Sequence, residues 1–220
     1  MRQTDEKTTK TDTSCIERDF GAPGAEYRGV PFWAWNTNIT QHHVESQTRM
    51  MRDMGFGGAV IHARSGLADP YMGDVFMKNV GASIEAAKAA GQFIWLYDED
   101  RWPSGCAGGE VSKDHKYRQK TVKFSKTCPE GLSTPEAGRE RGENYLLACY
   151  HVTVDGEGYL ESCRMTGAED ANLFAVVYTA PDHPRYNGQA YIDTLNPEAV
   201  ERFIELTYKP YTEAFGGEFG

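Results

Sequence analysis

Residues 55–67 have the sequence GFGGAVIHARSGL, in which a glycine-rich turn leads into a short apolar run and then into polar residues. The apolar run, Ala59–Ala63, has the length of a buried strand. A helical pattern precedes it, from a cap at Thr40 to about Met54, and Gly55 is a natural helix stop. A strand that directly follows a helix is typical of a parallel sheet, so this stretch indicates an α/β fold.

The same order of strand and helix occurs on both sides of this stretch. Arg28–Trp35 is predicted to form the strand before the first helix, and Phe93–Tyr97 the strand after a second helix. The strands start near 28, 59 and 93, and this spacing of about 30 residues is that of one βα unit. The run Ala190–Ile192, followed by a helix start at Asn196 and Pro197, is predicted to be a fourth unit.

Between the third and fourth units the pattern changes. Four β-like runs follow one another without a helical pattern between them, Asp155-Gly156 is typical of a hairpin turn, and residues 126–143 are predicted to be a loop. The four runs are Lys120–Ser125, Tyr145–Val154, Tyr159–Met165 and Leu173–Thr179. Residues 113–187 are therefore predicted to be an antiparallel β-rich insertion.

Four βα units make half of an eight-unit barrel. We therefore expect an α/β fold, a partial (β/α)8 TIM barrel of about four βα units with an inserted antiparallel β-rich segment. The expected organisation is a disordered polar tail at 1–25, three βα units at 26–112, the insertion at 113–187 and the fourth unit at 188–220. Because half a barrel leaves its end strands unpaired, we expect a truncated piece of a longer chain, inactive alone.

The composition disfavours several classes of protein. Lys and Arg total 23 and Asp and Glu 32, for a net charge of −9, which disfavours nucleic acid as a partner. No apolar stretch reaches the roughly 20 residues of a membrane helix, and the polar N-terminus is unlike a secretory signal, so a cytoplasmic location is expected. The five cysteines form no C-x-x-C pair, which disfavours a zinc site or a disulfide framework. The oligomeric state is left open.

Polar and aromatic side chains gather where each predicted barrel strand ends. The carboxyl ends of parallel strands meet at one rim, which is where such folds place their functional groups. Aromatic rings there offer a flat platform for a sugar, and amide, imidazole and guanidinium groups offer hydrogen bonds to hydroxyls. The candidate substrate-binding residues are Trp35, Asn36, His62, Arg64, Tyr97 and Trp102. Burial of Trp35 in the core and a structural role for His62 stay open.

The acidic run Asp98-Glu99-Asp100 directly follows the third predicted strand. Side chains alternate along a strand, so Glu99 is expected on one face and the two aspartates on the other. Neighbouring carboxylates repel one another, which favours a raised pKa and prepares an acid catalyst. Glu99 is therefore the candidate catalytic residue, and Asp98 and Asp100 are candidate ligands for calcium, which prefers oxygen ligands. A solvated charged loop is the alternative.

Four stretches together resemble the α-L-rhamnosidases of glycoside hydrolase family 106 and their relatives. They are RGVPFWAWN (28–36), GFGGAVIHARSGL (55–67), WLYDEDRWPSGCAGG (95–109) and LNPEAVERFIELT (195–207). The resemblance implies a barrel enzyme that hydrolyses glycosidic bonds in rhamnose-containing glycans, uses calcium and inverts the anomeric centre. It also implies further essential glutamates beyond Gly220, and the histidine usual after the Leu-Thr pair is Tyr208 here.

The predicted function is thus an α-L-rhamnosidase-like glycoside hydrolase that works by general acid/base catalysis, with carbohydrate as its partner and calcium as its cofactor. Two other functions fit the residues. One is a non-catalytic carbohydrate-binding or degenerate barrel protein, and the other is a metal-dependent barrel lyase or isomerase with its metal at Asp98 and Asp100. If Glu99 is the acid or base, Glu99→Gln should lower turnover at least about a hundredfold and weaken sugar binding far less.

Overall fold

The computed structural model describes residues 17, 19–132 and 135–219. The chain divides into two compact units, Met1–Tyr97 and Asp98–Gly220. Much of the polar tail predicted at 1–25 lies outside the described residues.

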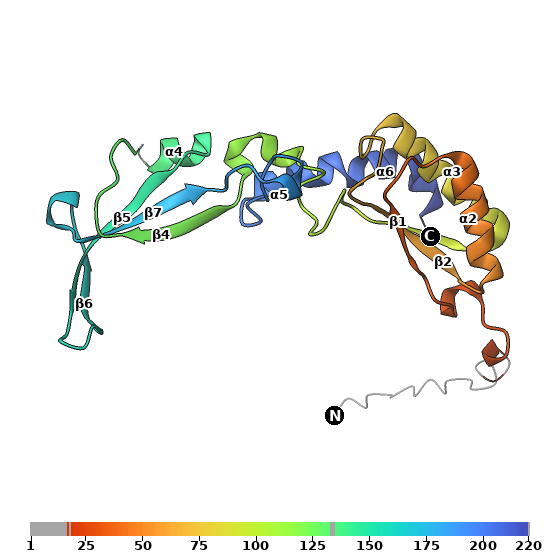
Figure 1. Cartoon of the computed structure of the whole chain (residues 1–220), viewed down its shortest axis with the longest axis horizontal. Coiled ribbons are helices and arrows are strands. Elements are labelled where there is room, and N and C mark those ends of the chain that lie inside the picture. Colours follow the sequence, from red (N-terminus) through yellow and green to blue (C-terminus); the bar gives the residue numbers. More distant parts are fainter. Residues whose placement is uncertain (1–16, 18, 133–134, 220) are drawn as a thin grey trace, which may run out of the picture. The chain divides into compact units, whose positions relative to one another are not determined.

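The first unit contains a three-stranded parallel sheet in the order β1-β2-β3 (Figure 1). The strands are β1 (Phe32–Trp35), β2 (Gly58–Ala63) and β3 (Phe93–Leu96). β2 lies in the middle, with His62 opposite Ala34 of β1 and Val60 opposite Trp95 of β3. The first three strands predicted from the sequence are therefore present and parallel.

Two helices connect these strands, α2 (Gln41–Asp53) and α3 (Asp74–Ala90). Thr40 caps α2 as predicted, because its hydroxyl accepts a hydrogen bond from the backbone N–H of His43. α3 is followed by Gly91, whose φ of 65° is a left-handed conformation that glycine adopts without strain. Asp74 is the first residue of α3, and Gly73 takes the cap position.

The parallel sheet has one covered and one open face. Trp33 and Trp35 are buried on the face that α3 covers, and the Trp35 ring lies 5.5 Å from that of Phe76 in α3. On the other face, Phe32 and Trp95 are about half exposed. Burial alternates along β1 because successive side chains of a strand point to opposite faces.

The second unit contains a four-stranded antiparallel sheet in the order β4-β7-β5-β6 (Figure 1). Its strands are β4 (Lys120–Ser125), β5 (Tyr145–Val154), β6 (Leu160–Met165) and β7 (Leu173–Thr179). These strands match the four β-like runs of the sequence, and Asp155 begins the turn between β5 and β6 as expected. A short helix, α4 (Pro135–Arg141), lies in the stretch predicted to be a loop.

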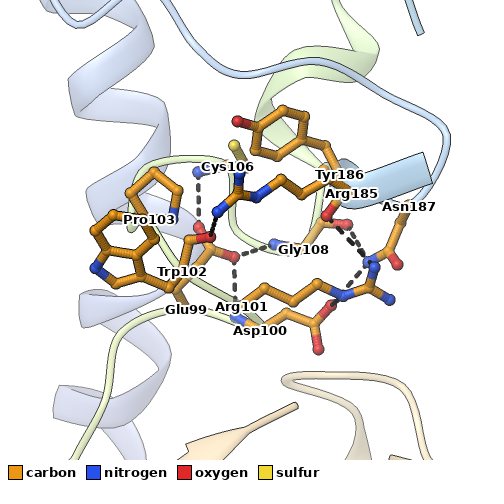
Figure 2. Close-up of a pocket in the computed structure, with 11 residues that line it drawn as sticks. Glu99, Asp100, Arg101, Trp102, Pro103, Cys106, Gly108, Arg185, Tyr186 and Asn187 are labelled. Atoms are coloured by element: carbon orange, nitrogen blue, oxygen red, sulfur yellow. Dashed lines mark hydrogen bonds and ion pairs between the residues drawn. The ribbon is translucent and has the colours of Figure 1, made fainter. Parts of the chain in front are cut away.

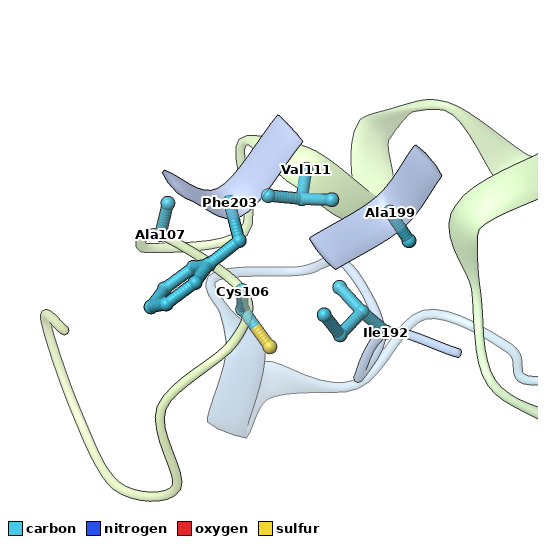
Figure 3. Close-up of a cluster of buried hydrophobic side chains, with 6 residues drawn as sticks. All are labelled: Cys106, Ala107, Val111, Ile192, Ala199 and Phe203. Carbon is cyan, nitrogen blue, oxygen red and sulfur yellow. The ribbon is translucent and has the colours of Figure 1, made fainter. Parts of the chain in front are cut away.

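A small hydrophobic core lies in the same unit (Figure 3). It consists of Cys106, Ala107, Val111, Ile192, Ala199 and Phe203. The last two belong to α5 (Pro197–Leu206), so this helix holds the loop around Cys106 in place. The core is where chain segments about 90 residues apart meet, and it supports the loop that carries the acidic run.

The C-terminal helices follow their sequence signals. Asn196 caps α5 by accepting from the N–H of Glu198, with Pro197 as the first helical residue. A second helix, α6 (Tyr208–Phe215), restarts just before Pro210, as expected from the missing N–H of proline. Among the described residues, no helix is both long and apolar enough to cross a bilayer.

The prediction of a partial (β/α)8 barrel is wrong. The parallel sheet has three strands, and the antiparallel sheet is separate from it. Ala190–Ile192, predicted to be the fourth barrel strand, instead contributes a single antiparallel bridge between Ile192 and Arg118. Ile192 is apolar because it packs against α5 in the small core. An apolar run of three residues cannot distinguish a strand from a buried loop, since both require burial.

Candidate functional site

The loop after β3 is built around the carboxylate of Glu99 (Figure 2). Only 2 % of Glu99 is exposed, and its two oxygens accept hydrogen bonds of 2.5–3.0 Å from five backbone N–H groups. The donors are Asp100, Gly105, Cys106, Ala107 and Gly108. Positive φ angles at Gly105, Ala107 and Gly108 turn successive N–H groups toward one point. Glu99 therefore fixes the conformation of residues 98–109.

Two opposing effects act on the proton affinity of Glu99. Burial raises the pKa of its carboxyl above the ordinary value, and the backbone N–H groups of Gly108, Asp100 and others oppose that rise. Burial is the larger effect. Burial, and after it the charge of Glu99, also raises the pKa of the Cys106 thiol to about 12, so this cysteine stays protonated and unreactive at neutral pH.

Asp98 links this loop to α6. Its carboxylate accepts from the hydroxyl of Ser104 at 2.6 Å and from the hydroxyl of Tyr208 at 2.7 Å. The hydrogen bond to Asp98, with a smaller contribution from burial, raises the pKa of Tyr208 to about 12. Tyr208, which stands in place of the expected histidine, thus contacts Asp98, the first residue of the acidic run.

Asp100 links the loop to the turn around Tyr186. Its Oδ2 lies 3.3 Å from Nε of Arg101 and accepts from the side-chain amide of Asn187 at 2.8 Å. Arg101 also donates to the backbone carbonyl of Pro184 at 3.2 Å. The charge of Asp100 is therefore balanced by a neighbouring guanidinium.

These contacts bear on the calcium predicted at Asp98 and Asp100. Both carboxylates already accept from side chains of the protein, whereas calcium requires about six to eight oxygen ligands. In the part of the chain that the structure describes, no group of three or more acidic, histidine or cysteine side chains is arranged to hold a metal. The described residues do not form a calcium site by themselves, and calcium binding stays a prediction.

A small hollow lies beside the loop (Figure 2). Its enclosed space is about 10 Å³, room for roughly one water molecule, and the hollow measures about 200 Å³ only when the part open to solvent is included. Asp100, Trp102, Arg185 and Asn187 are among its lining residues. Trp102 is 62 % exposed. The guanidinium carbon of Arg185 lies 5.8 Å from the centre of the Trp102 ring. The hollow therefore combines an exposed aromatic surface with amide, carboxylate and guanidinium groups.

The predicted residues of the first unit lie at the carboxyl ends of its strands. The rings of His62 and Tyr97 are 3.9 Å apart and 30° from parallel, and Nδ1 of His62 lies 2.7 Å from the carbonyl oxygen of Ala63. His62 is buried, whereas Asn36 and Arg64, which follow β1 and β2, are exposed. His62 therefore has structural contacts, while the amide and guanidinium groups are open to solvent.

Trp35 lies in the core of the first unit. None of its side chain is exposed, and its ring meets those of Trp33 and Phe76 edge to face. As placed, the ring is out of reach of a sugar, which matches the alternative of core burial that the sequence left open.

The predicted site residues thus form two groups, one in each unit. The loop of the second unit carries Asp98, Glu99, Asp100 and Trp102, and the strand ends of the first carry Asn36, His62, Arg64 and Tyr97. That both groups form one site stays a prediction. The sequence does not reveal Arg185 and Asn187, which lie more than 80 residues beyond the acidic run in a turn without a motif of its own.

Comparison with known proteins gives a distant likeness to a solved structure. No protein-family model matches the chain, and no curated protein matches it. The chain is similar to the solved structure of a rhamnosidase from Novosphingobium sp. PP1Y, with a TM-score of 0.42 and 19 % sequence identity over 64 % of this chain. The match spans 12 % of the length of that enzyme. We draw no functional conclusion from a likeness this distant.

Proposed function

We propose that this chain is part of an α-L-rhamnosidase-like glycoside hydrolase that acts on rhamnose-containing glycans, and that a sugar ring packs on Trp102. The observation that carries the proposal is the exposed indole of Trp102 beside the hollow lined by Asp100, Arg185 and Asn187. A sugar ring has apolar C–H faces and a rim of hydroxyls, so it matches an aromatic surface bordered by donors and acceptors. The four sequence stretches that resemble family 106 support the same proposal.

In this proposal Glu99 positions the loop that carries Trp102. Its carboxylate is buried and both oxygens are occupied by backbone N–H groups, so it reaches a substrate only if the loop opens. Aromatic surfaces bind best when they are held in place before the ligand arrives. An anchored loop gives Trp102 that preorganisation.

A non-catalytic carbohydrate-binding protein is the second candidate function. It is favoured by one observation, namely that Glu99 and Asp100, two carboxylates lining the hollow, are already held by other groups of the chain. Both functions require sugar contact at Trp102, and they differ in whether the bond is then hydrolysed.

The first prediction tests this contact. Trp102→Ala should weaken binding of methyl α-L-rhamnoside to the 220-residue chain roughly tenfold, as expected when an aromatic anchor is truncated. Isothermal titration calorimetry measures the affinity. Phe124→Ala is the matched control, because Phe124 in β4 is 65 % exposed and lies outside the hollow. Equal affinity in wild type and Trp102→Ala would contradict the proposal.

Hydrolysis is measured separately with an aryl α-L-rhamnoside. Release of the aryl group by the wild type, lost in Trp102→Ala and kept in Phe124→Ala, supports the hydrolase. Binding that depends on Trp102, with no hydrolysis by the chain, fits the second candidate and equally the piece of a hydrolase, inactive alone, that the sequence predicts.

A further inference from the structure

Arg185 is a cation at the edge of the hollow that lacks an acidic partner among the described residues. Its guanidinium lies over the Trp102 ring, and its Nη2 is 3.5 Å from the backbone carbonyl oxygen of Trp102 (Figure 2). The neighbouring Arg101, by contrast, is paired with Asp100. The two arginines of the hollow therefore differ, one neutralised within the protein and one available to a ligand.

The charges around the hollow do not cancel the charge of Arg185. Asp100 is paired with Arg101, and the carboxylate of Glu99 is surrounded by backbone N–H groups inside the loop. The chain has 32 acidic against 23 basic residues, so acidic side chains are plentiful. Other arginines of the described part, such as the exposed Arg164, also have no ion pair, but Arg185 differs from them because it lines the hollow beside Trp102. Its position points to a ligand as the source of the carboxylate.

Guanidinium groups recognise planar anions through two parallel N–H bonds, and a carboxylate fits that geometry. The ring of Trp102 and the guanidinium of Arg185 are adjacent, so one small molecule can contact both. We propose that this site takes an acidic sugar, whose ring packs on Trp102 while its carboxylate pairs with Arg185. This inference rests on the proposed carbohydrate contact and adds the class of sugar.

The net charge of −9 works against an acidic ligand at long range. At about 0.15 M salt the screening length is roughly 8 Å, so the contact with Arg185 outweighs the distant charges. The affinity is therefore measured at this salt concentration. Lower salt strengthens both the repulsion by the net negative charge and the attraction to Arg185, so it does not separate the two effects.

The second prediction compares matched pairs of sugars that differ in one group. Methyl glucuronide and methyl galacturonide carry a carboxylate where methyl glucoside and methyl galactoside carry a hydroxymethyl group. The wild-type chain should bind the better uronide of the two pairs about fivefold more tightly than its neutral partner, the upper range for one exposed ion pair. Calorimetric titration gives the four affinities.

Substitutions at Arg185 test whether this residue causes the preference for the uronide over the neutral sugar. Arg185→Gln should abolish the preference for the uronide, whatever its effect on the affinity for the neutral sugar, while Arg185→Lys should keep part of the preference, since lysine keeps the charge and loses the planar fork. Arg164→Gln is the matched control, because Arg164 on β6 is exposed and its loss changes the net charge by the same amount.

The outcomes separate the two proposals. Equal affinity for uronide and neutral sugar, or a preference that survives in Arg185→Gln, overturns the acidic-sugar inference. If rhamnoside or neutral sugars still bind in a manner that depends on Trp102, the carbohydrate function stands without it. If no sugar binds, both proposals are wrong.

Discussion

At the scale of single residues, the Glu99 carboxylate takes the place of water for backbone groups inside the loop. Five N–H groups that would otherwise face solvent or remain unpaired donate to its two oxygens. Buried backbone donors without partners are costly, so the loop and the carboxylate depend on each other. The sequence marks Glu99 as unusual, because an acidic side chain directly after a buried strand needs partners, and the catalytic role expected for it stays a prediction.

The third prediction concerns Glu99→Gln. The amide nitrogen of glutamine cannot accept a hydrogen bond, so at least one buried N–H loses its partner and the free energy of unfolding should fall by about 1–3 kcal/mol. Sugar affinity at Trp102 should fall with it. Urea unfolding and calorimetry measure the two effects.

Glu110→Gln is the control for this change, since Glu110 lies close to the loop but is exposed and pairs only with Lys113 among the described residues. Unchanged stability and sugar binding in Glu99→Gln, with turnover at least about a hundredfold lower, would instead support the acid or base role expected from the sequence.

The fourth prediction concerns pH and Tyr208. The folded protein holds the phenol proton more tightly than the unfolded chain, because the pKa rises from 10.0 to about 12 beside Asp98. The resulting stability is fully present below pH 10 and is lost as the pH rises toward 12. Urea midpoints in this range should fall more steeply for the wild type than for Tyr208→Phe. Parallel curves for the two proteins would show that this hydrogen bond contributes nothing.

At the scale of elements, the parallel sheet depends on close contact between β2 and β3. Gly58 lies opposite Phe93, and a Cβ atom added there would collide with the backbone carbonyl of Phe93 and lie 2.9 Å from the Trp95 ring. Only glycine allows the two strands to approach at this point. The glycine-rich turn that identifies the strand in the sequence is therefore also a requirement of the strand pairing.

The fifth prediction follows from this contact. Gly58→Ala should lower the free energy of unfolding by about 2–4 kcal/mol, because backbone atoms of β3 must move. Gly156→Ala, in the turn between β5 and β6, has open space around the added methyl group and should change stability by no more than about 0.5 kcal/mol. Equal urea midpoints for the two variants would show that the sheet adjusts freely.

Local signals predict most of the elements and explain the errors. The caps at Thr40 and Asn196 place the starts of two helices, because capping chemistry is encoded within a few residues. α4 is missed because the proline, glycine and charged residues of 126–143 resemble a loop more than a short helix. Ala190–Ile192 is misassigned because burial alone makes it apolar.

At the scale of the whole molecule, a barrel requires the parallel sheet to close on itself, and no local sequence pattern encodes that closure. Three βα units predict three parallel strands whether or not further strands join them. The candidate site also depends on long-range contacts that no local sequence pattern reveals. Trp102 and Glu99 stand out in the sequence, whereas Arg185 becomes significant only when the fold brings its turn to the loop around Glu99. Contacts over 80 residues of chain have no sequence period to reveal them.

The unequal burial of the four tryptophans gives the protein a built-in optical reporter. Trp35 and Trp33 are 0 % and 8 % exposed, whereas Trp95 and Trp102 are 44 % and 62 % exposed. We expect emission from the buried pair at shorter wavelength and with little quenching by acrylamide, and emission from Trp95 and Trp102 at longer wavelength and with strong quenching. A ligand that covers Trp102 should therefore protect part of the long-wavelength emission from the quencher, and unfolding of the first unit should shift the short-wavelength emission to longer wavelength. A single fluorescence measurement should thus distinguish ligand binding at the hollow from unfolding of the parallel sheet.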